Sequence, residues 1–260
     1  MRLDLKQPED IQYHSDESSW MDSIQSRLPD PSLGLSDPTA GSNVLEVIDR
    51  FLDNTYLPLC GARIHVTLKR YPNETDIEKL VSKIRQHQAV VSVVIQTDST
   101  GGFHPETMYN LATRTNGLGF FDAAYWSPSI EEDMSVFYDS PSLVYSVNAN
   151  VSQVGSMTLP SYYSSNNTYH LIMLTVQDSE VRSSFQSFSL NFTSPTDTQI
   201  LNLTNCESNR ASNFIECYFH FEAGNYTVTL NYAYNDTQQQ SLQLRMNTYE
   251  HIDYWIPYAD

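Results

Sequence analysis

The chain has 260 residues, of which 31 are acidic and 14 are basic, giving a formal net charge of −17. Such a surface repels nucleic-acid phosphates and anionic membranes, because affinity for both comes from Lys and Arg, so we expect no nucleic-acid partner. No apolar run reaches the roughly 18 residues of a spanning helix, so we expect no transmembrane segment. The length allows one large domain or two of ordinary size.

The N-terminal half begins with alternating helical and extended patterns. Residues 1–5 resemble a strand remnant, and apolar residues at helical spacing predict a helix within 17–28. A connection rich in Pro, Gly and Ser spans 29–42. An amphipathic stripe then predicts a helix over 44–52, and the alternation in 63–68 predicts a strand.

The same alternation continues to about residue 121. Thr75 and Glu78 form the pattern of a capping box that opens a helix. A β-branched run predicts a buried strand over 89–96, and an amphipathic segment predicts a helix over 105–116. Gly117 stands where a helix C-terminus favours positive φ. This order predicts a parallel sheet with helices on both faces.

After residue 126, short alternating runs replace the helical patterns. We predict strands near 134–138, 142–149, 156–159, 168–176, 185–193, 199–204, 214–221, 225–233 and 241–248. Strands at this interval predict an all-β sandwich of the immunoglobulin-like kind. Within it, the run around Tyr226 is similar to a strand whose Tyr hydroxyl caps the adjacent corner. The expected fold class is therefore α/β plus all-β, with an incomplete doubly wound parallel sheet in residues 1–125 and a β-sandwich in 126–260.

The cysteines and sequons point to the secretory pathway. Cys206 and Cys217 flank a polar turn, and we predict a disulfide between them, with two reduced cysteines as the alternative; the bond would contribute roughly 3 kcal/mol. Cys60 is left over, either as a buried thiol or as one that has lost its partner. Asn-x-Ser/Thr occurs at Asn73, Asn150, Asn166, Asn191, Asn202, Asn225 and Asn235.

In a strand, residues i and i+2 share a face, so the sequon asparagines Asn191, Asn202 and Asn225 are expected to point outward together with their hydroxyl partners. We predict glycosylation at these sites; the alternative is that the outward positions of any sandwich are rich in Asn and Thr. Glycosylation and a disulfide both imply an extracellular location. That location requires a signal peptide, and we expect none within this chain, because its first 25 residues contain no apolar stretch of signal-peptide length.

Residues 41–52 (GSNVLEVIDRFL), 90–102 (VVSVVIQTDSTGG) and 107–117 (TMYNLATRTNG) resemble the later part of a von Willebrand factor A domain. They are most similar to the divergent A domains that nematode secreted proteins join to a β-rich domain of unknown function. The resemblance covers about residues 1–125, and the sandwich resembles the accompanying domain more loosely. It implies that the domain's first strand precedes Met1. We hypothesise that Met1 is internal to a longer product that carries this strand and a leader.

Domains of this family hold Mg²⁺ at the C-terminal edge of the sheet, through an Asp-x-Ser-x-Ser turn, a Thr and a further Asp. Thr39 is at the threonine position, but Lys69 and Arg70 stand where the last acidic ligand belongs. Two cations repel a divalent ion, so we expect no metal and no cofactor. A candidate strand-end ligand surface remains, made of Thr39, Asp98, Ser99 and Thr100.

The sequence contains no nucleophile elbow, Walker loop or dinucleotide fingerprint, and its His residues lack metal-ligand spacing. We therefore expect no catalytic residues and a binding or adhesion-type glycoprotein that contacts an extracellular protein or glycan. One alternative is a hydrolase that uses strand-end carboxylates such as Asp98. Another is a fragment of a longer secreted protein without independent function. Four C-terminal aromatic residues form either an exposed patch or a packing contact: Tyr249, Tyr254, Trp255 and Tyr258.

Overall fold

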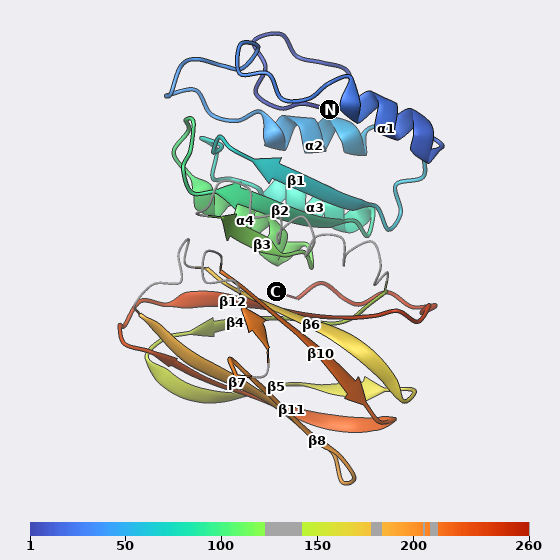
Figure 1. The fold of residues 1–260 in the computed structure, drawn as a ribbon, viewed down its shortest axis with the longest axis vertical. Helices are drawn as coiled ribbons and strands as arrows, with labels where there is room; N and C mark the ends of the chain where they lie inside the picture. The colour runs from blue at the N-terminus through green and yellow to red at the C-terminus, as the bar shows by residue number, and fades with distance from the viewer. Residues whose placement is uncertain (123–141, 178–183, 205, 209–212, 260) are drawn as a thin grey trace.

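The structure is a computed structural model that describes residues 1–122, 142–177, 184–204, 206–208 and 213–259 (Figure 1). The helices are α1 (Glu17–Gln25), α2 (Val44–Leu52), α3 (Glu78–Gln86) and α4 (Pro105–Arg114). The strands are β1 (Arg63–Leu68), β2 (Val90–Gln96), β3 (Gly119–Asp122), β4 (Ser142–Val151), β5 (Val154–Ser164), β6 (Thr168–Val176), β7 (Phe185–Thr193), β8 (Thr198–Asn202), β9 (Glu207–Ser208), β10 (Phe214–Phe221), β11 (Gly224–Tyr234) and β12 (Gln240–Thr248). The strand expected over 134–138 and the boundary expected at 125/126 lie outside the described residues.

The protein is mixed α/β and mostly β-sheet. A parallel sheet has the strand order β1-β2-β3. Two antiparallel sheets follow, with the orders β4-β12-β6-β10-β9 and β5-β11-β7-β8. Figure 1 shows the helices and the parallel sheet above, and the two antiparallel sheets stacked below them.

Among the described residues, the helices pack on one face of the parallel sheet and the sandwich packs on the other, so the expectation of helices on both faces is wrong for this part of the chain. Apolar residues of α2, α3 and α4 pack on one side of the sheet, against Val91, Val93 and Ile95 of β2. On the opposite side, Val94 and Phe120 pack against Leu171 and Met173 of β6. An antiparallel sheet thus takes the place that a second layer of helices would have. The sequence pattern did not reveal this, because a strand buried by a sheet is as apolar as one buried by helices.

The free edge of β3 is covered by two amide side chains from the sandwich. Gln243 accepts a hydrogen bond from the Gly119 backbone N–H at 2.8 Å. Asn213 accepts one from the Phe121 N–H at 2.8 Å and donates to the Gly119 carbonyl at 3.0 Å. Asn213 and Gln243 are 1% and 0% exposed. Exposed strand edges are sites of aggregation. Here the two buried amides form hydrogen bonds with the backbone groups at the edge of β3, so that edge is not available to another strand.

Two local expectations are corrected by the backbone. The expected capping box at Thr75 does not form: α3 begins at Glu78, and the Glu78 N–H donates to the Asp76 carboxylate at 3.2 Å. After α4, Asn116 takes the positive φ of 58° that we expected of Gly117. Gly117 is required for another reason, since a Cβ there would lie 1.9 Å from the Val91 carbonyl oxygen.

The two N-terminal elements are also shorter or simpler than expected. Residues 1–5 contribute only an isolated antiparallel bridge between Leu5 and Gly34. The helix expected within 17–28 ends at Gln25, and its first turn is capped by Asp16, whose carboxylate accepts from the Ser19 N–H at 2.8 Å. The structure therefore begins with a short, exposed helix and no strand.

The β-sandwich has the strand pairing of a jelly roll. In chain order, β4 pairs with β12, β5 with β11, β6 with β10 and β7 with β8, as though one long hairpin had been wound on itself. The first four strands, β4 to β7, therefore alternate between the two sheets, whereas an immunoglobulin-like sandwich keeps its first two strands in one sheet. The immunoglobulin-like order expected from the sequence is wrong, because strand periodicity says which residues face inward but not which strands pair.

The core of the sandwich lies between its two sheets and is rich in aromatic rings. Phe192, Phe221 and Tyr226 pack edge to face or nearly so, with ring centroids 5.1–5.2 Å apart. The Tyr226 hydroxyl donates to the Glu222 carbonyl at 2.9 Å and lies 2.8 Å from the Asp197 carboxylate. The corner-capping role expected of Tyr226 is therefore present, although the sandwich type is different.

Candidate functional site

The C-terminal edge of the parallel sheet is organised around one buried cation, Arg70, which is 2% exposed. Its guanidinium donates to three backbone carbonyls of the loop over residues 35–40, at 2.8, 2.7 and 2.6 Å: those of Leu35, Asp37 and Ala40. Backbone hydrogen bonds from Thr100 to Lys69 and from Gly102 to Pro38 close the same cluster. This edge therefore holds together the loop and the two turns on which the expected strand-end residues lie.

The structure brings the expected strand-end residues to this one edge: Thr39, Asp98, Ser99 and Thr100. Most of their side chains are exposed, and Ser99 is half-buried. The Ser99 hydroxyl donates to the Gly101 carbonyl at 2.6 Å, and the Thr39 hydroxyl donates to the Asp37 carboxylate at 2.7 Å. These hydroxyls therefore stabilise their own turns.

The residues at this edge do not fit the magnesium site that the resemblance implies. The Arg70 guanidinium fills the space beside the turn, and a Cβ on Gly101 would lie 2.2 Å from its Nη1 atom. A guanidinium bound to carbonyl oxygens uses the ligands that a hard cation would need and repels the cation itself. In the part of the chain that the structure describes, no group of three or more His, Cys, Asp or Glu is placed to hold a metal.

The hydrolase alternative required Asp98 to meet a second acid in a deep pocket. Asp98 is exposed. It does not line either of two pockets among the described residues, one at the junction of the two units and one between α3 and α4. An exposed carboxylate outside both of these pockets does not meet that requirement, which favours binding over acid–base chemistry at this place.

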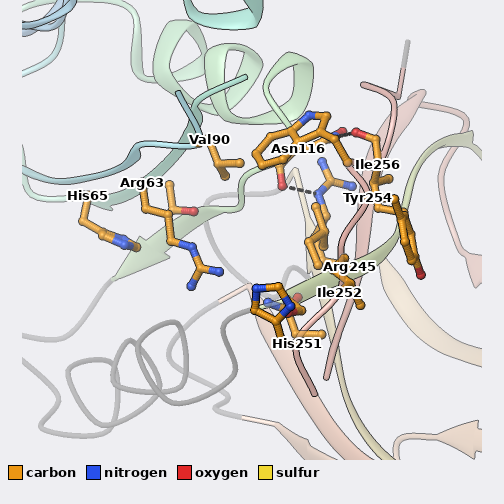
Figure 2. A pocket seen from close by; sticks show the side chains of 15 residues that line it. Arg63, His65, Val90, Asn116, Arg245, His251, Ile252, Tyr254 and Ile256 are labelled. Atoms are coloured by element: carbon orange, nitrogen blue, oxygen red, sulfur yellow. Dashed lines mark hydrogen bonds between the residues drawn. The ribbon is translucent and has the colours of Figure 1, made fainter. Parts of the chain in front are cut away.

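A deeper candidate site lies at the junction between the parallel sheet and the sandwich (Figure 2). This junction pocket has a volume of about 270 Å³. Its lining residues come from β1, β2, β4, β12, the C-terminal segment and the turns before β1 and after α4: Gly61, Arg63, His65, Val90, Ser92, Asn116, Ser142, Leu143, Arg245, Asn247, His251, Ile252, Tyr254, Trp255 and Ile256. Figure 2 shows Arg63 and His65 on one side, and Arg245, Tyr254 and Ile256 on the other.

The described lining of the junction pocket contains basic and aromatic side chains but no carboxylate. Burial lowers the pKa of His65, and the nearby Arg63 charge lowers it further, so the neutral imidazole is favoured at pH 7. Burial likewise lowers the pKa of Arg63, which stays charged at neutral pH. The pocket therefore presents hydrogen-bond donors and ring faces in a molecule whose overall charge is strongly negative.

Arg245 forms the floor of the junction between the two units and is 1% exposed. Its Nε donates to the Asn116 and Gly117 carbonyls at 3.0 Å each. Its terminal nitrogens donate to the Val147 carbonyl and the Asn148 side-chain oxygen, both at 2.9 Å. Burial lowers the pKa of this guanidinium to about 9, which still leaves it protonated at pH 7.

The C-terminal segment runs back along the junction. Of its four aromatic residues, some pack against the parallel-sheet unit and others are exposed, so both of the roles expected from the sequence occur. Tyr258 packs against the parallel-sheet unit: its hydroxyl donates to the Ala89 carbonyl at 2.9 Å, and Arg85 lies over its ring at 5.1 Å. Tyr254 and Trp255 line the pocket and remain 54% and 37% exposed. Tyr249 is exposed outside the pocket lining.

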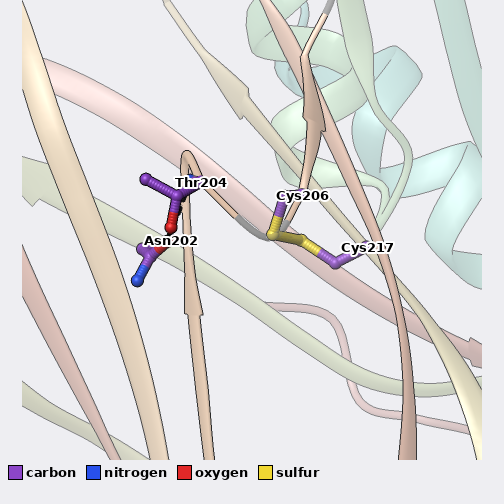
Figure 3. The surroundings of a disulfide bond; sticks show 4 residues. All are labelled: Asn202, Thr204, Cys206 and Cys217. Atoms are coloured by element: carbon purple, nitrogen blue, oxygen red, sulfur yellow. Dashed lines mark hydrogen bonds between the residues drawn. A yellow bond between two sulfur atoms is a disulfide. The ribbon is translucent and has the colours of Figure 1, made fainter.

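The structure joins Cys206 and Cys217 in a disulfide, next to the sequon at Asn202 (Figure 3). It ties β10 to the segment that follows β8. Cys60 is an exposed free thiol, so it is not the buried thiol that was one of our two expectations. Of the sequon asparagines, Asn191 and Asn202 are half-buried, and the other five are exposed.

Sequence reasoning missed the polar residues that build the junction, namely Asn213, Gln243 and Arg245. Each lies in or beside a sandwich strand and turns toward the parallel sheet. A charged or amide residue at an outward strand position ordinarily indicates solvent. Nothing in the chain's periodicity distinguishes an outward position that faces water from one that faces a second sheet.

Comparisons with known proteins leave the function open. A family model described as a domain of unknown function (DUF7154) matches residues 147–249, which span most of the sandwich. No curated protein matches the chain. None of the described helices has the length and hydrophobicity needed to cross a bilayer.

Similarity to solved structures is weak and confined to part of the chain. The C-terminal carbohydrate-binding module (CBM6) of LamC, a laminarinase from Zobellia galactanivorans, has a TM-score of 0.27 and 14% identity, over 42% of this chain and 96% of that one. A module from Cellvibrio mixtus lichenase 5A, in complex with cellotriose, has a TM-score of 0.24 and 13% identity, over 44% and 94%. The C-terminal domain of a structural protein from sulfolobus turreted icosahedral virus has a TM-score of 0.23 and 16% identity, over 40% and 98%. Scores at this level support no argument about this chain.

Proposed function

We propose that this protein is a secreted glycoprotein that binds a glycan through the junction pocket, without catalysing a reaction. The observation that carries the proposal is the pocket itself. It is concave and is built jointly by the parallel sheet, the sandwich and the C-terminal segment. Small-ligand sites are found preferentially at such interfaces between units, where apolar walls carry a few fixed polar groups.

The chemistry of the lining fits a sugar ring. A pyranose has an apolar face of C–H groups and a rim of hydroxyls. Trp255 and Tyr254 offer ring faces at the pocket, while Ser92, Asn247 and Arg63 carry polar atoms on its walls. Aromatic side chains supply such contacts with large apolar area and little conformational freedom to lose. The volume of about 270 Å³ suits one terminal sugar unit and no long chain.

The extracellular placement is supported by the Cys206–Cys217 disulfide and by the accessibility of the sequons. Disulfides persist in oxidising compartments and are rare in the cytosol. Secretion requires a leader peptide. Release of N-glycans from protein taken from its native source should lower its mass, and an unchanged mass would remove this part of the proposal.

The divergent von Willebrand factor A-like assignment of the N-terminal unit, with its nematode-type β-rich companion, is likewise our proposal. The parallel order β1-β2-β3, with a helix in each connection, agrees with it. At the strand ends, Arg70 holds the loop that a metal would otherwise organise. The unit then serves as a scaffold for the junction pocket.

The pocket is tested by changing Trp255 to Ala. The full-length protein is screened against an array of neutral and acidic glycans, and any ligand found is titrated by intrinsic fluorescence. We expect Trp255→Ala to abolish binding of that ligand. The control is Trp20→Ala, at a Trp that is 47% exposed on α1 and is not part of the pocket lining. Equal binding by wild type and Trp255→Ala, or binding to no glycan on the array, would refute the proposal.

A further inference from the structure

The outer face of the four-stranded sheet is the open face of the sandwich. Figure 1 shows β5, β11, β7 and β8 in the layer farthest from the parallel sheet. The outward positions of these strands are exposed or half-buried and are occupied mainly by Ser, Thr and Asn: Ser156, Thr158, Ser187, Ser189, Asn191, Thr193, Asn202, Asn225, Thr227, Thr229 and Asn231. Cross-strand partners such as Asn191 and Thr229 place these side chains next to one another.

No residue of β5, β7, β8 or β11 is charged, although 17% of the chain is charged. Charge is the ordinary means by which an exposed sheet avoids pairing with another copy, and Lys on edge strands is the commonest device. The five-stranded sheet does not need charged residues for this purpose, because the parallel sheet covers part of its outer face. The four-stranded sheet, with its two edge strands β5 and β8, has neither charge nor a covering layer among the described residues.

Three of the sequons lie on this face. Asn191 is on β7, one strand from the edge, with Thr193 two residues further along the same face. Asn225 and Thr227 have the same relation on β11, and the register pairs Thr227 with Thr193. Asn202 ends the edge strand β8.

At Asn202 the side-chain geometry suits a glycan acceptor. Its amide oxygen accepts hydrogen bonds from the Thr204 backbone N–H at 2.9 Å and from the Thr204 hydroxyl at 2.6 Å. Figure 3 shows the amide nitrogen, the atom to which an N-glycan is attached, pointing away from Thr204. The oxygen is therefore held by the sequon's own threonine, while the nitrogen is turned outward.

We infer that N-glycans on Asn191, Asn202 and Asn225 cover the outer face of the four-stranded sheet and keep it from pairing with other molecules. The inference rests on the secretory placement proposed above. The glycans take the role that charged side chains have on other exposed sheets. They also leave the junction pocket, on the other side of the five-stranded sheet, as the uncovered binding surface.

The test uses the full chain, secreted from a eukaryotic cell behind a supplied leader peptide. In one variant, Thr193, Thr204 and Thr227 are changed to Ala, which removes the three sequons without touching the asparagines. In the matched control, the same three residues are changed to Ser, which keeps the sequons. Glycopeptide mapping should find glycans on all three asparagines in the wild type and in the Ser control, and on none in the Ala variant. Light scattering should show monomer for the first two and loss of monomer to aggregates for the third.

A rescue variant separates aggregation from misfolding. Adding Thr158→Lys and Ser187→Lys to the Ala variant places charge at two exposed positions of the same face. We expect these lysines to restore the monomer without glycans. An Ala variant that is monomeric by itself, or one that the lysines do not rescue, would overturn the inference.

The mapping also distinguishes this inference from the proposed function. If the protein from its native source carries N-glycans elsewhere but none on these three asparagines, only the inference fails. If it carries none at any sequon, the secretory placement fails as well.

Discussion

Replacing Arg245 by Met should destabilise the protein by about 3–5 kcal/mol, because it leaves several buried carbonyl acceptors at the junction without a hydrogen-bond donor. Met has a similar length and packs in apolar surroundings, so the change removes hydrogen bonds rather than volume. The guanidinium donates to backbone carbonyls on both sides of the junction, including those of Asn116, Gly117 and Val147. Without it these buried acceptors lose their partner, at roughly 1–3 kcal/mol for a lone group.

The structure also specifies the control variants for this prediction. Arg245→Lys should remain strongly destabilised, because three donors on a flexible stem cannot replace five in a planar fork. Arg114→Met removes an exposed ion pair in which Arg114 lies 2.7 Å from the Glu78 carboxylate. Exposed pairs contribute about 0–1 kcal/mol, so this variant should stay close to wild type.

The assay is chemical denaturation at neutral pH, followed by tryptophan fluorescence and far-UV circular dichroism. In the wild type we expect the two signals to change together, because the buried polar contacts at the junction join the two units. In Arg245→Met the midpoint should fall, and the two signals should separate as the units uncouple. A loss below about 1 kcal/mol, equal to that of Arg114→Met, would refute the view that Arg245 holds the junction.

Two further predictions concern the sandwich. Burial lowers the pKa of His170 to about 4, below its ordinary value of about 6.5, so between these values the unfolded chain binds a proton that the folded protein excludes. The contribution of neutral His170 to the free energy of unfolding should therefore be fully present above pH 6.5 and fall by on the order of 3 kcal/mol as the pH approaches 4. In urea titrations across this range, His170→Phe should make the stability less dependent on pH. An unchanged profile would contradict the view that His170 is buried in its neutral form. Replacing Cys206 and Cys217 by Ser should cost roughly 3 kcal/mol by opening a loop of 11 residues, whereas Cys60→Ser, at an exposed free thiol, should change the thermal midpoint little; equal midpoints for the two variants would contradict this.

The sequence by itself determined the local elements well. The buried run of β2, the apolar stripes of α2 and α3, and the alternation of β7 and β11 are fixed by which side chains avoid water, and periodicity records that directly. The pairing of Cys206 with Cys217 and the hydroxyl contact of Tyr226 depend on residues close in the chain, so their patterns could also be recognised.

Tertiary structure decided how these elements are assembled. The pairing of β4 with β12 joins opposite ends of the sandwich, and no local pattern encodes a partner about a hundred residues away. The same limit explains the errors over the immunoglobulin-like order and over helices on both faces. It also explains why the sequence did not reveal the junction pocket. Arg63 and Arg245 appear in the sequence as ordinary surface residues, and they join Trp255 in one site only because the sandwich packs against the bare face of a parallel sheet.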